Sequence, residues 1–198
     1  MASVAADPVV QAGLAAEVAV LVAAAHRGGG DMSYLRVFKH LLHFPWQVHR
    51  AFPARTMHAI ESAILNTEQQ HAGELRFAVE GALDLPELLR GVTARERALE
   101  VFGNLRVWDT EYNNGVLIYL LMADHDVEII ADRGMHQRIA TGEWENVCRA
   151  MEALLRQGQY EAAVLQGVAL VGALLQQHYP ALGEKRNELD NRPVVVKH

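Results

Sequence analysis

The stretch NLRVWDTEYNNGVLIYLLMADHDVEIIADRG, residues Asn104 to Gly134, contains two apolar runs joined by a short polar segment. The first run, Val116 to Met122, is apolar except for Tyr119 and follows Asn113-Asn114-Gly115, a strong turn signal. This pattern predicts a central strand that is covered on both faces. Only Ala123-Asp124-His125-Asp126 separates it from the second run, Val127 to Ala131, so the two runs are predicted to form an antiparallel hairpin.

The segments around this hairpin predict an α/β fold. Residues 74–80 alternate between apolar and charged side chains, as in a half-buried strand, and Thr93 with Glu96 forms a capping box before a helix. A strand, a helix and a strand in this order predict a right-handed crossover that makes the two strands parallel. Helical spacing predicts further helices over Pro53–Gln70, Trp144–Leu155 and Tyr160–Leu175. We therefore expect an α-β-α sandwich, with a mixed three- to four-stranded sheet and helices on both faces.

The chain is predicted to have four parts. Residues 1–31 form an N-terminal extension, either poorly ordered or an accessory helix, and either Met1 or Met32 can serve as the start of translation. Residues 32–53 form an amphipathic, aromatic arm, residues 54–180 form the domain, and residues 181–198 form a polar C-terminal tail.

Composition excludes several classes of protein. The chain has 198 residues, of which 51% are apolar and 21% charged, and its net charge of −6 comes without a basic stripe. This argues against nucleic-acid binding, which needs clustered Lys and Arg to neutralise phosphates. The single cysteine, Cys148, cannot form an intrachain disulfide and fits a reducing compartment. We expect a cytoplasmic protein, peripheral to the inner membrane if the arm binds lipid; the oligomeric state does not follow from the sequence.

The arm at residues 32–53 has two interpretations. It interleaves aromatic residues such as Phe38 and Trp46 with basic ones, which is typical of a segment that binds a membrane surface or a protein partner. The alternative is a short helix that packs on the domain, as aromatic stripes at helical spacing usually do. His40 and His43 are interpreted as a surface pair, because no third metal ligand follows in register.

Polar residues before and after the predicted strands suggest where chemistry takes place. A seven-residue strand is roughly 23 Å long, so its two ends cannot share a site. Carboxylate and amide oxygens gather at the amino end, and these are the ligands that Ca²⁺ or Mg²⁺ prefers. The predicted metal ligands are Glu74, Asp109, Glu111, Asn113, Asn114 and Asp132. A solvated loop is the alternative, and Asp124 and Asp126 at the other end are predicted to be plain turn residues.

The ordered series of motifs resembles the TPM domain family, named after a thylakoid lumen protein, a photosystem repair protein and an acetylcholine-receptor accessory protein. The similarity covers about residues 54–180 and rests on five segments. They are His71-Ala72-Gly73-Glu74-Leu75, Ala98 to Phe102, Asn113-Asn114-Gly115-Val116-Leu117-Ile118, Val127-Glu128-Ile129, and a turn at Gly134 before Trp144. The resemblance implies an α-β-α sandwich, a calcium site as reported for some members, and an acid phosphatase activity as attributed to others. The family's Gly-aromatic-Gly turn is here Asp132-Arg133-Gly134.

Two functions follow as hypotheses. The first is a calcium-binding interaction module of a bacterial cell, because the oxygen ligands occur without a nucleophile or a known catalytic motif. The alternative is a metal-assisted acid phosphatase acting on phosphomonoesters, in which Asp109 or Asp132 positions the attacking water.

Overall fold

The computed structural model describes residues 34–136, 138–181 and 187–197. The predicted N-terminal extension, residues 1–31, and the choice between Met1 and Met32 lie outside the described residues. Contacts divide the chain into residues 1–36 and residues 37–198, and the description below concerns the second unit. None of the described helices combines the length and apolar character needed to cross a bilayer.

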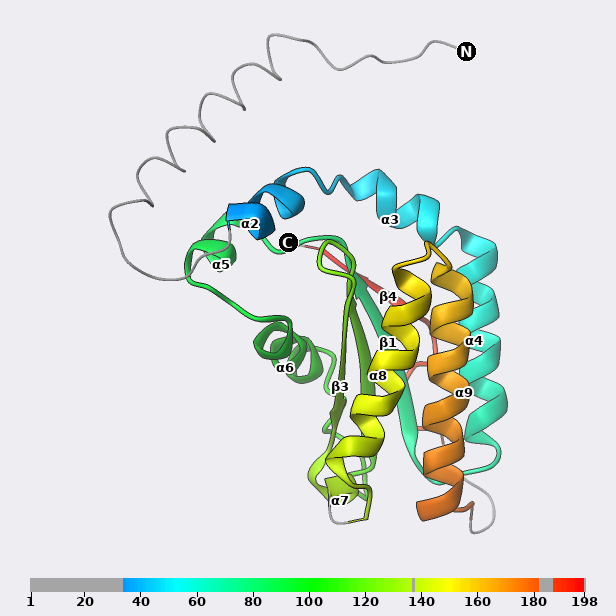
Figure 1. The fold of residues 1–198 in the computed structure, drawn as a ribbon. Helices are drawn as coiled ribbons and strands as arrows, with labels where there is room; N and C mark the ends of the chain where they lie inside the picture. Colours follow the sequence, from blue (N-terminus) through cyan, green and yellow to red (C-terminus); the bar gives the residue numbers. More distant parts are fainter. Residues whose placement is uncertain (1–33, 137, 182–186, 198) are drawn as a thin grey trace, which may run out of the picture. The chain divides into compact units, whose positions relative to one another are not determined.

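A four-stranded mixed sheet forms the centre of this unit (Figure 1). Its strands are β1 (Glu74–Glu80), β2 (Gly115–Leu121), β3 (Asp126–Ala131) and β4 (Val194–Val196), in the order β3-β2-β1-β4. β1 pairs in parallel with both β2 and β4, and β3 pairs antiparallel with β2. The predicted α/β class, the crossover and the hairpin are therefore confirmed, and part of the C-terminal tail joins the sheet as its fourth strand.

Helices cover both faces of the sheet (Figure 1). One face packs against α4 (Ala54–Glu68), α8 (Thr141–Leu155) and α9 (Tyr160–His178) through a core that includes Phe77 and Ile118. The other face packs against α5 (Leu85–Leu89) and α6 (Ala94–Asn104) through a core that includes Leu117 and Ile130. As predicted, α6 begins at a capping box in which the Thr93 hydroxyl accepts from the Glu96 N–H.

β1 is buried on both faces, so the prediction of a half-buried strand was wrong. Its charged residues Glu74, Arg76 and Glu80 are all less than 9% exposed, because α6 and the C-terminal segment cover them. Glu80 accepts hydrogen bonds from the Arg97 guanidinium of α6 and from the Tyr119 hydroxyl of β2. Charged residues in an alternating pattern here indicate a buried polar network and not a solvent-exposed face.

The arm forms two short helices ahead of the domain, α2 (Tyr34–Leu41) and α3 (Pro45–Ala51). His40 is buried, and its Nδ1 accepts from the Leu83 N–H at 2.9 Å while its Nε2 lies 3.1 Å from Asp124 Oδ1. The predicted surface pair is therefore wrong for His40, because this ring joins α2 to two loops at the carboxyl end of the sheet. Phe52, directly after α3, packs against Phe77 and Tyr160 with ring centroids 5.9 and 6.0 Å away.

Candidate functional site

The polar residues predicted at the amino end of the parallel strands come together in part. Glu74 of β1 lies opposite Gly115 of β2, and the Asp132 N–H donates to the Gly115 carbonyl at 2.9 Å. Glu74 and Asp132 therefore flank Gly115 at one end of the sheet. A Cβ at Gly115 would lie 1.9 Å from the Val107 carbonyl oxygen, so the loop that precedes β2 crosses directly over this position.

Asn114 and Asp132 each have a side-chain oxygen at this end that is buried without a hydrogen-bond donor among the described residues. Asn114 donates from Nδ2 to the Ala72 carbonyl at 2.6 Å, but its Oδ1 accepts nothing. Asp132 Oδ1 accepts from the Arg133 N–H at 2.6 Å, whereas its Oδ2 is buried and unsatisfied. Most buried acceptors have a partner, so an ordered water or a cation is expected to complete these two oxygens. Glu74, also buried, accepts from the Leu189 N–H at 3.3 Å.

The remaining predicted ligands lie apart from these oxygens or have other partners. Asp109 and Glu111 are exposed on the loop before β2, and the Glu111 N–H donates to Glu188. Asn113 Oδ1 accepts from the Arg133 guanidinium at 3.1 and 3.2 Å, so a cation of the chain itself already contacts it. Over the described ranges, no three His, Cys, Asp or Glu side chains are placed to hold one metal ion. The six predicted residues therefore do not form a complete ligand shell for a metal ion.

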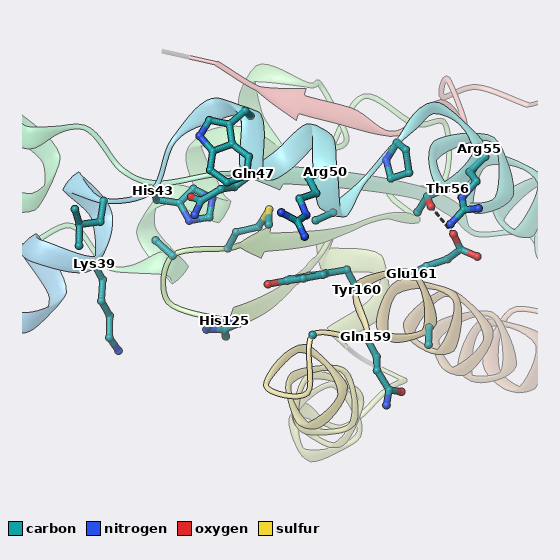
Figure 2. Close-up of a pocket in the computed structure, with 18 residues that line it drawn as sticks. Lys39, His43, Gln47, Arg50, Arg55, Thr56, His125, Gln159, Tyr160 and Glu161 are labelled. Carbon is teal, nitrogen blue, oxygen red and sulfur yellow. Dashed lines mark hydrogen bonds between the residues drawn. The ribbon is translucent and has the colours of Figure 1, made fainter. Parts of the chain in front are cut away.

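A cavity of about 850 Å³ lies at the opposite, carboxyl end of β1 and β2 (Figure 2). Three segments line it: the arm with the first residues of α4, the β2–β3 turn, and the turn between α8 and α9 with the first residues of α9. Its volume falls within the range of small-molecule sites, and open α/β sheets usually bind ligands at this end of their strands. The cavity is therefore the candidate ligand site of the domain.

The cavity wall is strongly basic. Lys39 from α2, Arg50 from α3 and Arg55 from α4 line it, and none of them forms a salt bridge within the described part of the chain. Its one carboxylate, Glu161 at the start of α9, accepts a hydrogen bond from the Thr56 hydroxyl (Figure 2). Three permanent cations therefore face a cavity with a single acidic side chain.

Two histidines add charge that depends on pH. Burial lowers the pKa of His43, and the neighbouring His40 and His125 lower it further. Burial, Lys39 and Arg156 likewise lower the pKa of His125, although Asp124 opposes them. His43 Nε2 is buried and has no hydrogen-bond partner among the described residues. The His43 ring packs where Gly81 leaves room, because a Cβ at Gly81 would lie 3.1 Å from His43 Cδ2. An anion in the cavity would favour the protonated form of both rings.

Aromatic and amide side chains complete the cavity. Figure 2 shows Gln47 and Arg50 on one side, coming from α3, with Tyr160 and His125 across from them. Tyr160 begins α9, and its ring is held by an edge contact with Phe52. The charged group of a ligand bound here would contact the cations and amide groups, and the remainder of the ligand would contact the aromatic ring of Tyr160.

A second, acidic cavity of about 480 Å³ runs along the edge strand β3. Burial raises the pKa of Asp126 to about 6, and the charges of Glu128, Glu152 and Asp124 contribute to the rise. Burial, Glu128 and Glu152 raise the pKa of the Cys148 thiol to about 12, so this cysteine is not a nucleophile at neutral pH. The Arg95 guanidinium donates to the Ile129 carbonyl at 2.9 Å, which protects the outer edge of β3 from pairing with another strand.

Sequence reasoning missed the basic cavity because its residues come from segments far apart in the chain. The notable signal was in the arm itself, since no acidic residue occurs between Asp31 and Glu61. Only the fold shows that this basic segment lies at the carboxyl end of the sheet, next to His125 and Tyr160.

The fold and its cavity define an α/β sandwich domain with a candidate ligand site at the carboxyl ends of its parallel strands. The family model of the TPM domain matches residues 50–174, so the chain belongs to the TPM domain family, as the sequence motifs indicated. The chain is also similar to the BA42 protein from the psychrophilic bacterium Bizionia argentinensis, whose structure was determined by NMR. The similarity has a TM-score of 0.64 at 26% identity, over 72% of this chain and 94% of that one. No curated protein sequence matches the chain significantly.

Proposed function

We propose that this TPM domain is a binding module whose basic cavity takes a small anionic ligand carrying a phosphate or carboxylate group. The observation that carries the proposal is the trio of Lys39, Arg50 and Arg55, which line one cavity and have no salt-bridge partner among the described residues. Cations gathered in a cavity repel one another, and an anion relieves that repulsion.

The energetics favour an anion over a neutral ligand. A hydrogen bond to a charged group contributes about 1.5–3 kcal/mol, so two such contacts contribute about 3–6 kcal/mol, compared with about 4.1 kcal/mol for millimolar binding. His43 and His125 strengthen the site at lower pH. Their pKa values lie below 6.5, so acidification through that region adds positive charge to the cavity. Affinity for an anion that stays charged is therefore expected to rise as the pH falls below 6.5.

Binding fits this geometry better than hydrolysis. The carboxylates of the phosphatase hypothesis, Asp109 and Asp132, lie near the amino end of β2, roughly 20 Å from the cavity at about 3.3 Å per strand residue. Within the cavity, Thr56 is only 2% exposed and its hydroxyl donates to Glu161, so it ties α4 to α9 and is closed to a substrate. The phosphatase alternative stays a prediction, and hydrolysis of phenyl phosphate that is lost in Asp132→Asn would support it.

Isothermal titration calorimetry with inorganic phosphate, phenyl phosphate and benzoate tests the proposal. We expect binding of at least one anion, none of phenol, and weakening of about tenfold or more in Arg50→Gln, since one charge-assisted hydrogen bond is lost. Arg90→Gln is the matched control, because Arg90 is exposed and lies outside the cavity. Equal affinities in Arg50→Gln, Arg90→Gln and the unmodified protein would refute the proposal. Phenyl phosphate and benzoate distinguish the two anionic groups.

A second candidate function is binding of Ca²⁺ or Mg²⁺ at the amino end of the sheet. It is supported by the two buried oxygens without donors, Asp132 Oδ2 and Asn114 Oδ1. If the ion binds only the folded state, millimolar calcium should raise the melting temperature, and Asp132→Asn should abolish that rise. Asp109→Asn, at an exposed position, serves as the control. A melting temperature that calcium leaves unchanged would exclude this candidate.

A further inference from the structure

The arm that forms one wall of the basic cavity also carries an exposed apolar surface. Phe38, Leu42, Phe44 and Trp46 are each about half exposed, between 49% and 56%, within nine residues of chain. Large apolar side chains gathered on a surface mark a site of interaction with a protein or a membrane. Leu42 and Trp46 belong to this surface and also line the cavity, so the apolar surface and the cavity are continuous.

The charge of this surface identifies its partner. The segment between Asp31 and Glu61 contains basic residues and no acidic ones, although the chain as a whole has a net charge of −6. An anionic surface would attract the arm and repel the remainder of the protein, so it would bind the molecule in one orientation. Basic residues interleaved with Trp and Phe are the composition of segments that bind at the headgroup level of an anionic membrane.

We infer that the arm docks this domain on an anionic bilayer, with Phe38, Leu42, Phe44 and Trp46 at the interface and a lipid phosphate in the basic cavity. This inference rests on the proposed anion site and names the source of the anion. The headgroup phosphate contacts the guanidinium and ammonium groups of Arg50 and Lys39, which line the cavity beside the apolar residues. Neither feature suffices alone for membrane binding. The cavity provides selectivity for anionic lipid, and the apolar side chains provide insertion into the interface of the bilayer.

Vesicle flotation of the full-length protein tests this inference. We expect binding to phosphatidylglycerol vesicles and none to phosphatidylcholine vesicles at about 0.1 M salt, where charges are still felt over about 10 Å. Lys39→Gln/Arg50→Gln should reduce partitioning roughly 25-fold, at about fivefold for each basic residue near the surface. Phe38→Ser/Phe44→Ser should also reduce it, while leaving calorimetric binding of soluble phosphate unchanged, because neither side chain lines the cavity. Arg90→Gln should behave like the unmodified protein.

The outcomes separate this inference from the proposed function. Binding of soluble phosphate without flotation on phosphatidylglycerol overturns the membrane inference and leaves the anion site intact. Failure of both assays overturns both. Flotation that Phe38→Ser/Phe44→Ser does not weaken would mean that another part of the chain holds the lipid, and it would overturn the membrane inference. If light scattering shows a dimer that this variant dissociates, a second copy of the chain covers the arm, and the membrane inference is wrong.

Discussion

Replacing Arg97 by Met should destabilise the domain more than any substitution on its surface. Arg97 of α6 donates to both oxygens of Glu80, at 2.9 to 3.3 Å, and contacts Glu87 at 3.0 Å and Glu100 at 2.9 Å. The side chains of Glu80 and Glu87 are 1% and 8% exposed, whereas that of Glu100 is 54% exposed. Burial lowers the pKa of Arg97, but the hydrogen bonds and charge of Glu80 outweigh burial, so the net pKa lies above its usual value.

The expected magnitude follows from this burial. Removing one partner of a buried ion pair costs about 3–5 kcal/mol, because the other charge stays buried without it. Glu100→Gln removes only a half-exposed partner and should cost at most about 1 kcal/mol. Urea unfolding at pH 7, followed by circular dichroism, measures both. In the double variant Glu80→Gln/Arg97→Met, the total loss should be smaller than the sum of the two single losses, because the buried carboxylate has been neutralised.

An Arg97→Met loss below about 1 kcal/mol, equal to that of Glu100→Gln, would refute this reasoning. It would mean that water or another group compensates the carboxylates of Glu80 and Glu87. Strictly additive losses in the double variant would likewise show that Arg97 and Glu80 are not coupled.

Three further predictions concern other parts of the domain. Gly115→Ala should lower the free energy of unfolding by at least about 2 kcal/mol, because the new Cβ would clash with the Val107 carbonyl. Gly142→Ala is the control and should be neutral or slightly stabilising, because a Cβ there would lie in open space. Urea unfolding measures both. Asp126→Asn should raise the melting temperature at pH 7.5 and have no effect below pH 3.8. The folded-state pKa of Asp126 is raised to about 6, so the folded protein holds its proton more tightly and loses stability as the pH rises from 3.8 to 6. His40→Ala should speed amide hydrogen exchange in residues 37–51 and weaken phosphate binding, because it removes the contacts of the arm with Leu83 and Asp124. Unchanged exchange rates would mean that Phe52 alone holds the arm.

The elements of this fold could be predicted from local patterns. The uninterrupted apolar run of β2 predicts a strand covered on both faces, and the Thr93 capping box predicts the start of α6; both are observed. β1 shows where such reasoning fails. Its alternation of apolar and charged residues looks identical whether the charged face meets water or a buried partner, and the partner Arg97 lies on a later helix. For the same reason, local patterns do not show whether the C-terminal residues form a strand such as β4, because pairing depends on whether the tail reaches the edge of the sheet at β1.

The candidate site was harder to predict than the fold, because the sequence shows where cations and oxygen ligands occur along the chain but not which of them lie close together in the folded protein. The carboxylates around β2 suggested a metal site, yet Asp109 and Glu111 are exposed and Asn113 bonds to Arg133. Conversely, the sequence shows that the arm is basic, but it does not show that these residues lie at the carboxyl end of the sheet. Local polarity can indicate that a residue is available for chemistry, but the chain topology decides which residues share a site.

The position of the arm also bears on how ligand recognition varies within the family. The family model begins at residue 50, whereas Lys39, His43 and Gln47 of the cavity wall precede it. The sheet and its helices can therefore be common to family members while one wall of the cavity is supplied by sequence outside the shared domain. Replacing residues 37–47 would change the charge and shape of the cavity while keeping Val48 and Phe52, the buried residues of the arm that belong to the core. Ligand preference is then expected to depend on the arm as well as on the domain, which supplies Arg55, so members with an acidic arm should bind the anion of this chain more weakly.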